Sequence, residues 1–231
     1  MRAFESIPAR RRAGAELCFA LALLASSSGR AGASAATAAP PLVAPLTTQA
    51  IRVDGRLDEP AWREAAVVAL GWETEPGENL PAPIATTCRL LYDRERLYVG
   101  CQAADPHPEE IRARFTDRDQ AYDGDFVGVR LDPFLDRRRA FEFYVSPLGV
   151  QMDLFRDDLA AGRPGGDDDE DTSWDALWDS AGRITAEGYE VELAIPFSSL
   201  RFPPGGESLT WGIGFARVQP RRDRLELASE P

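Results

Sequence analysis

The sequence predicts an all-β fold, an antiparallel β-sandwich with short helical turns. In a series of short segments, apolar residues alternate with polar ones at the two-residue period of a β-strand. Glycine, proline and aspartate turns separate these segments, and almost no stretch shows the longer repeat of an amphipathic helix. Short strands at such close spacing are typical of two antiparallel sheets packed face to face.

The first expected elements lie in residues 51–62, "IRVDGRLDEPAW". This segment begins as a short strand, and the Asp54-Gly55 dipeptide predicts a turn after it. Pro60 is suited to the first position of a helical turn, where no backbone N–H is needed. We expect Trp62 to anchor that turn on the core.

A β-hairpin is expected in residues 86–105, "TTCRLLYDRERLYVGCQAAD", with its loop at residues 93–96. If Tyr92 faces Leu97, the same register places Cys88 opposite Cys101. The two cysteines could form a disulfide, which an exported protein permits. Alternatively they are small buried thiols, an interpretation favoured by the short loop that a bridge would close.

Later segments continue the alternation, and each has one apolar face. Between the apolar residues of residues 189–195 lie Glu190 and Glu192, nearly 7 Å apart along a strand. That spacing could suit a pair of glycosidase carboxylates, but the alternation favours a solvent-facing position for both. The expected apolar faces are Val127, Val129 and Leu131; Phe141, Phe143 and Val145; Val150, Met152 and Leu154; Tyr189, Val191, Leu193 and Ile195; and Trp211, Ile213 and Phe215.

The N-terminal part predicts export. Residues 1–35 combine an arginine cluster, an apolar run at 17–25 and a small-residue cleavage site, as a secretory signal peptide does. Residues 36–49 have the alanine, proline and threonine composition of a linker. We therefore expect a periplasmic or outer-membrane-associated protein.

Charge and composition exclude several functions. The formal net charge is −12, so the chain should avoid nucleic acid and anionic membrane surfaces. His107, the single histidine of the chain, lies between two prolines, which argues against a Ser-His-Asp triad and against zinc. Haem is not expected either, because lysine is absent and Met152 alternates with apolar residues.

Several motifs together resemble a known family. Residues 51–62, the hairpin sequence, "DGDFVGVRLDPFLDRRRAFEFYVSPLGVQMD" and "LWDSAGRITAEGYEVELAIPFSSLRF" are similar, in this order, to the carbohydrate-binding module family 9-like domain. The closer resemblance is to the version at the N-terminus of exported bacterial proteins that continue into a predicted outer-membrane β-barrel. The resemblance covers residues 50–220, and residues 221–231 would be a tail at the junction to such a barrel.

The resemblance implies a jelly-roll-like sandwich that binds sugars on aromatic platforms. Trp62, Trp178 and Trp211 lie in segments expected in the core, so Trp72 and Trp174, which border loops, are the candidate carbohydrate-binding residues. Alternatively, both tryptophans cover the edge of the sandwich, since tryptophan is highly buried on average.

The founding modules of that family bind calcium, so acidic clusters are candidate metal sites. Residues 117–125, "DRDQAYDGD", offer Asp119, Asp123 and Asp125 as possible calcium ligands at the entrance of a strand. The acidic run at residues 167–171 lies in a low-complexity insertion, residues 161–175, which composition identifies as a mobile solvated loop. No other cofactor is expected.

The sequence therefore predicts non-catalytic binding of a poly- or oligosaccharide by a monomeric, exported β-sandwich. Two alternatives stay open. The domain could be a structural accessory of an outer-membrane β-barrel with no ligand of its own, or it could be a glycoside hydrolase with two carboxylates in a cleft.

Overall fold

The computed structural model describes residues 42–158, 170–204, 208–221 and 224–230. The expected signal peptide, residues 36–41 of the expected linker and most of the acidic insertion at 161–175 lie outside these ranges. No helix within the described ranges is long and apolar enough to cross a membrane.

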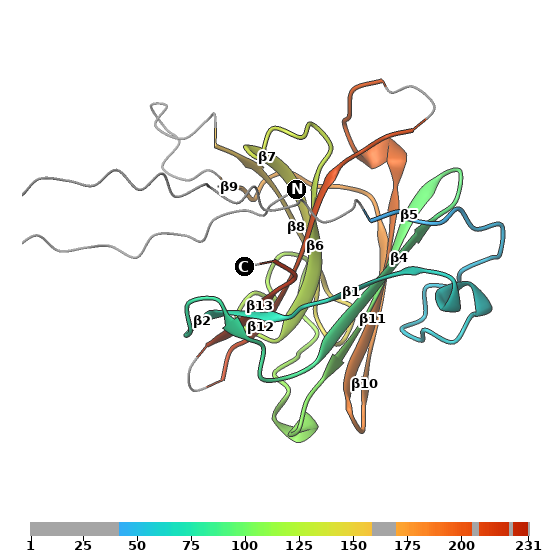
Figure 1. Ribbon diagram of the computed structural model, residues 1–231. Helices are drawn as coiled ribbons and strands as arrows, with labels where there is room; N and C mark the ends of the chain where they lie inside the picture. Colours follow the sequence, from blue (N-terminus) through green and yellow to red (C-terminus); the bar gives the residue numbers. More distant parts are fainter. Residues whose placement is uncertain (1–41, 159–169, 205–207, 222–223, 231) are drawn as a thin grey trace, which may run out of the picture.

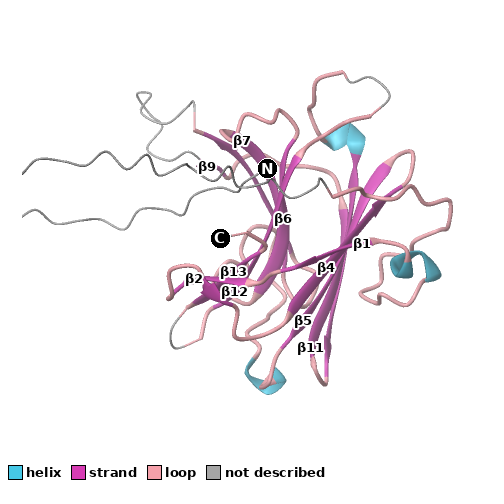
Figure 2. Cartoon of the chain, viewed as in Figure 1, coloured by secondary structure: helices cyan, strands magenta, loops and turns pink. Residues whose placement is uncertain are grey.

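Two antiparallel sheets form the fold, so the predicted β-sandwich is confirmed (Figure 1, Figure 2). Among the described residues the helical elements are short 3-10 helices: η1 (Pro60–Arg63) precedes β1, η2 (Pro108–Glu110) follows β5 and η3 (Phe197–Ser199) follows β11. The five-stranded sheet has the order β1-β4-β5-β11-β10, with bounds β1 (Ala66–Ala69), β4 (Thr86–Tyr92), β5 (Arg96–Ala104), β10 (Asp179–Thr185) and β11 (Gly188–Pro196). The eight-stranded sheet has the order β3-β2-β13-β12-β6-β7-β8-β9, with bounds β2 (Trp72–Glu75), β3 (Leu80–Pro81), β6 (Phe126–Asp132), β7 (Arg139–Val145), β8 (Gln151–Asp157), β9 (Glu170–Asp171), β12 (Gly212–Gln219) and β13 (Leu225–Ala228).

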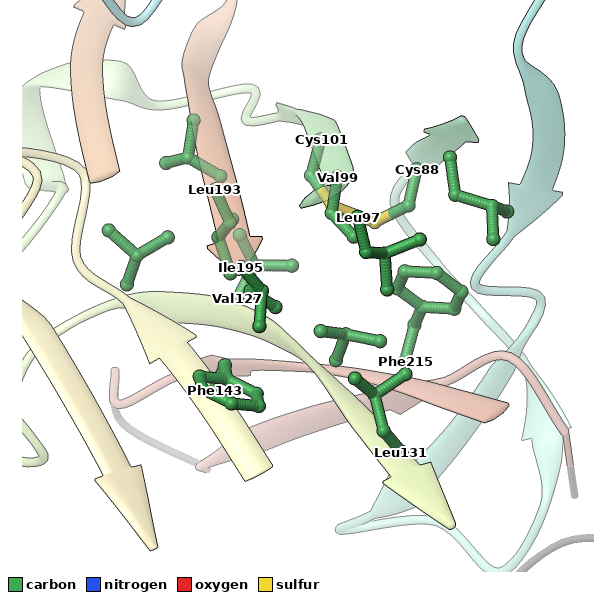
Figure 3. Close-up of a cluster of buried hydrophobic side chains, with 14 of the residues drawn as sticks. Cys88, Leu97, Val99, Cys101, Val127, Leu131, Phe143, Leu193, Ile195 and Phe215 are labelled. Atoms are coloured by element: carbon green, nitrogen blue, oxygen red, sulfur yellow. A yellow bond between two sulfur atoms is a disulfide. The ribbon is translucent and has the colours of Figure 1, made fainter. Parts of the chain in front are cut away.

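Apolar side chains from both sheets meet in one large cluster between them (Figure 3). Val99 and Leu193 come from the five-stranded sheet, Val127 and Phe143 come from the eight-stranded sheet, and all four are 0% exposed. Burying a side chain of this size stabilises the fold by about 1.5–3 kcal/mol. The inward faces predicted for β6, β7 and β11 therefore form the core.

Strand β8 differs from its prediction. Met152 lies opposite Tyr144 and Leu154 lies opposite Glu142, so both share the outward face of the sheet. The inward position between them belongs to Asp153, whose carboxylate is fully buried and accepts the backbone N–H of Ala176. Apolar residues fill the outward face here because a second layer of side chains covers it.

The hairpin of β4 and β5 has the predicted register. Tyr92 lies opposite Leu97 and Cys88 lies opposite Cys101. The two sulfur atoms form a disulfide, 2.04 Å long, inside the core (Figure 3). Of the two states that the sequence left open, the structure therefore has the oxidised one, because directly opposed positions bring the two Cβ atoms within bonding reach.

The segment before β1 covers the outer side of the five-stranded sheet, and in Figure 1 its short helix η1 lies outside β4 and β5. Trp62 is 2% exposed and packs there with Leu91 and Tyr98, in a second apolar cluster. Trp62 therefore anchors the helical turn as expected, but on the outer side of the five-stranded sheet and not between the two sheets. The end of the expected linker is also tied down, because the N–H of Thr47 donates to the carbonyl of Tyr92.

Glu192 departs most from its prediction, because its side chain is fully buried. Its Oε2 accepts the backbone N–H groups of Asp54, Gly55 and Arg56 at 2.8, 2.7 and 3.3 Å. Its Oε1 accepts the indole N–H of Trp62 at 3.3 Å. The alternation correctly predicts an outward direction, but residues 51–65 fold over that face and exclude water from it.

Gly55 makes this contact possible. Its φ of +81° is in the left-handed region that favours glycine, and a Cβ there would come within 3.1 Å of the Gly182 backbone. Glu190, two residues before Glu192, stays partly exposed and pairs with Arg183. Only one of the two glutamates is therefore on the solvent side.

We expect Glu192 to make stability depend on pH. Burial raises the pKa of Glu192 to about 7, against the opposing effect of the three backbone N–H donors. The folded chain then holds this proton more tightly than the unfolded chain does, so the contribution of Glu192 to stability is greatest below pH 4.5 and is lost as the pH rises through about 7. Relative to Glu192→Gln, the wild type should lose up to about 3 kcal/mol of unfolding free energy across this window.

Urea unfolding of both proteins at several pH values measures this difference. Glu190→Gln is the matched control, because Glu190 lies on the same face of β11 and its carboxylate bonds only to side chains. This substitution should lower the unfolding free energy by less than about 1 kcal/mol. The expectation is contradicted if the unfolding free energies of the wild type and Glu192→Gln differ by the same amount at every pH.

The disulfide yields a second prediction. Replacing both cysteines by alanine should lower the unfolding free energy by about 3 kcal/mol, because the unfolded chain regains the freedom of the closed loop. Chemical denaturation of the Cys88→Ala, Cys101→Ala double variant tests this value. If the wild type and the variant unfold at the same urea concentration, the bridge is absent from the purified protein.

Candidate functional site

Trp72 and Trp174, the tryptophans expected to bind sugar, lie far apart. Trp72 begins β2 and is half-buried, opposite Ala228. Trp174 is half-buried as well, and its ring centroid lies 5.0 Å from that of Phe141 on β7. Strands β13, β12 and β6 separate β2 from β7, which corresponds to about 19 Å at about 4.8 Å per strand. Trp174 also packs on Phe141 and Phe143 of the inward face, whereas Trp72 lies on the outward face, so the two rings cannot form one platform.

The outward face of the eight-stranded sheet carries a continuous row of side chains that includes Trp72. Residues directly opposite each other on neighbouring strands share a face. This outer-face row is Trp72 on β2, Ala228 on β13, Ala216 on β12, Gly128 on β6 and Tyr144 on β7. Two aromatic residues thus flank a floor of three small ones.

Two glycines, Gly128 in the row and Gly214 near it, leave space on this part of the outward face. A Cβ on Gly128 would come within 2.6 Å of the Tyr144 ring, so glycine allows that ring to lie across the strand. A Cβ on Gly214, which lies two residues before Ala216 on β12, would meet no atom within 4 Å. Open space therefore lies above this part of the sheet.

Polar side chains border the Tyr144 end of the row. The Tyr144 hydroxyl donates to Glu142 at 2.5 Å and accepts from Nε of Arg130 at 2.8 Å. Arg156 donates to the second oxygen of Glu142 at 2.9 Å. Burial raises the pKa of Tyr144, and interaction with Tyr144 and Glu142 raises the pKa of Arg130. The phenol is therefore neutral and the guanidinium charged at neutral pH.

Tyr122 extends the aromatic surface and was missed as a site residue by sequence reasoning. Its ring packs edge-on against Phe126, with centroids 5.8 Å apart, and Phe126 packs against Tyr144 at 5.3 Å. Burial raises the pKa of the Tyr122 phenol, and its hydroxyl has no hydrogen-bond partner among the described residues. Its sequence signal was an aromatic residue inside the acidic run of residues 117–125.

The three aspartates expected to bind calcium do not come together. Asp119 joins Asp153 and Asp175, and ligand atoms of these three lie within 4.8 Å of one another. Burial raises the pKa of Asp119. Arg118 pairs with all three carboxylates, through Nε at 3.1 Å from Asp175 and 3.6 Å from Asp119 and through Nη2 with Asp153. A guanidinium therefore already neutralises this acidic group.

Asp123 and Asp125, the other two, line a pocket of about 360 Å³. Asp123 is exposed and pairs with Arg114 at 2.8 Å. Asp125 is fully buried, and its Oδ2 accepts the backbone N–H of Arg112 at 2.8 Å. Burial raises the pKa of Asp125. The other lining residues are Ala113, Ala121, Gly124 and Ser146.

The glutamates considered for glycoside hydrolysis lie on the opposite side of the molecule, on the five-stranded sheet. A raised pKa is the property expected of a catalytic acid, and Glu192 has it. Main-chain donors and the Trp62 indole nevertheless occupy both of its oxygens under a covering segment. This carboxyl holds the segment in place and is closed to a substrate.

Comparison with known proteins agrees with this architecture. A family model described as "Carbohydrate family 9 binding domain-like" matches residues 53–220. No curated protein matches the chain.

Solved structures share the fold at low sequence identity. One is a carbohydrate-binding module of family 9 from Caldicellulosiruptor kristjanssonii in complex with cellotriose, at 17% identity and a TM-score of 0.53, covering 81% of this chain and 83% of that one. The same module in complex with glucose gives 16% identity and a TM-score of 0.52, covering 80% and 83%. A putative carbohydrate-binding protein from Bacteroides uniformis gives 14% identity and a TM-score of 0.56, covering 81% and 88%. The family match spans most of the β-sandwich, and the chain therefore belongs to the carbohydrate family 9 binding domain-like family.

Proposed function

We propose that the protein binds an oligo- or polysaccharide, without catalysis, on the outward face of the eight-stranded sheet. The observation that carries this proposal is the outer-face row, in which aromatic residues flank a floor of small residues with polar groups at one end. Sugar sites need flat apolar surfaces for C–H groups together with a few fixed hydrogen-bonding groups. Membership of a family of carbohydrate-binding domains supports the same function.

Trp72 and Tyr122 are the proposed stacking residues, because both are half-buried aromatic side chains. Trp72 is one end of the outer-face row, and Tyr122 lies near the other end, next to Phe126. Arg130, whose side chain is partly exposed, would bind a sugar hydroxyl, and its contact with the buried Glu142 at 3.1 Å holds it in position. Trp174, the other tryptophan expected to stack, contacts Phe141 and Phe143 of the core. For Trp174 we therefore propose a supporting role in the core.

A titration with cellotriose tests the stacking residues, since a structurally similar module was solved with that sugar. Trp72→Ala and Tyr122→Ala should each weaken binding by about two- to tenfold, the loss expected for one aromatic contact. Tyr122→Phe is the matched control, because it keeps the ring and removes only the hydroxyl. Isothermal titration calorimetry measures the affinities, after a glycan array has identified the best sugar.

Two results would count against this proposal. Unchanged affinity in both alanine variants would remove the outer-face row from the binding site. Absence of binding to any glycan on the array would favour the accessory-domain alternative, in which the aromatic residues only cover the sheet.

We also propose that calcium can bind the Asp119, Asp153 and Asp175 group, in competition with Arg118. Each of the three carboxylates brings one ligand oxygen to the group, fewer in all than the six to eight that calcium prefers. The Arg118 guanidinium already contacts each carboxylate. A calcium ion would therefore have to displace the Arg118 guanidinium from the three carboxylates, because both cannot contact them at once.

Arg118→Gln should destabilise the fold by about 3 kcal/mol, because the buried Asp153 loses its cation. Calcium at about 10⁻³ M should restore much of this loss in the variant and leave the wild type nearly unchanged. Thermal unfolding with calcium and with chelator measures both effects. Arg114→Gln, which breaks the exposed pair with Asp123, is the control. A wild type that loses stability in chelator would show that calcium binds beside Arg118.

Export to the periplasm or the outer membrane is the proposed location. The signal-peptide pattern of residues 1–35 supports it. The Cys88–Cys101 disulfide supports it independently, because such bonds persist in oxidising compartments.

A further inference from the structure

The pocket beside Tyr122 has a rim and a floor of different character. Arg112, Arg114 and Asp123 are exposed and form the rim. Asp125 and Ser146 are buried and form the floor. A volume of about 360 Å³ lies within the range of small-molecule sites, at its lower end. The pocket can therefore hold one compact polar unit.

This pocket continues the proposed sugar-binding surface. Ala121 and Asp123, the neighbours of Tyr122 on both sides, line it. Ser146 follows Tyr144 by two residues along the same chain direction, so it continues the outward face at the end of β7. A glycan that lies on Tyr122 would thus place its next sugar unit in the pocket.

The rim offers a cation that has no acidic partner. Arg114 is paired with Asp123 at 2.8 Å, but no carboxylate lies within ion-pair distance of the Arg112 guanidinium in the described part of the chain. Two further bonds hold Arg112: its Nη1 donates to the Pro220 carbonyl and its backbone N–H donates to Asp125. The guanidinium is therefore held in place with donors still available to an anion.

The floor offers an acceptor that also lacks a partner. Oδ2 of Asp125 takes the Arg112 N–H, while Oδ1 is buried and has no hydrogen-bond partner among the described residues. A ligand hydroxyl that donates to this oxygen would supply the hydrogen bond that it lacks. An arginine at the rim and an acceptor at the floor match a sugar that carries both a carboxylate and hydroxyls.

We propose that this pocket binds a uronic acid residue of an acidic glycan. The sugar carboxylate pairs with the Arg112 guanidinium, which is suited to two-pronged contact with a carboxylate. A ring hydroxyl donates to Asp125, and the adjoining neutral sugars lie on the outer-face row. This inference rests on the proposed carbohydrate binding and specifies the class of glycan.

The test compares two ligands of equal length, cellotriose and a trisaccharide that ends in glucuronic acid, by isothermal titration calorimetry on the full chain. The acidic ligand should bind about tenfold more tightly to the wild type, as one charge-assisted contact provides. Arg112→Gln should abolish this preference, Arg112→Lys should keep part of it, and Asp125→Asn should weaken both ligands. Arg138→Gln, which removes an exposed arginine that is not a pocket residue, should change neither affinity.

The outcomes separate the two proposals. If both trisaccharides bind equally and Arg112→Gln changes neither, the uronate pocket is wrong while carbohydrate binding stands. If only free glucuronate binds, and Arg112→Gln removes that binding, the pocket stands and the outer-face row is wrong. If neither trisaccharide nor free glucuronate binds, both proposals fail. Circular dichroism of each variant excludes misfolding as the cause.

Discussion

The two-residue alternation of the strands decides both the core and the outer surface of this fold. Because the sheets bury one face of each strand, every residue between two inward positions must point outward. In β6 and β7 the inward residues Val127 and Phe143 form the core, and the outward residues Gly128 and Tyr144 form the candidate site. The core packing and the candidate site are therefore set by a single register.

Glu192 shows how a second layer changes the meaning of an outward position. The strand directs its carboxylate away from the core, as alternation requires, yet residues 51–65 cover it and donate three backbone N–H groups. Trp62, in the same segment, adds its indole N–H. Two sequence motifs 130 residues apart thus meet at one carboxylate, which explains why the covering segment needs a turn, a glycine and a tryptophan in close succession.

The candidate site was only partly predictable for a related reason. Trp72 and Trp174 both border loops in the sequence. In the structure Trp72 reaches the outward face, whereas Trp174 packs on Phe141. Tyr122 could not be chosen from the sequence, because its importance comes from Phe126 and Tyr144, which lie beside it only in the folded sheet. The aspartates around Tyr122 also have different partners. Asp119 accepts the backbone N–H of Asp153 on β8, whereas Asp125 accepts the backbone N–H of Arg112.

Sequence patterns alone predict the β-sandwich, the register of the hairpin that places Cys88 opposite Cys101, and the inward faces of β6, β7 and β11. These follow from local periodicity and from turn residues, which act over a few positions. The folded structure was needed for the burial of Glu192, the outward position of Met152 and the grouping of Asp119 with Asp153 and Asp175. It was also needed for the redox state of the cysteines, because alternation places them opposite each other without deciding whether they are oxidised. The contacts that cover Glu192 and Met152 and group the aspartates join segments distant in the chain, and local periodicity carries no information about such contacts.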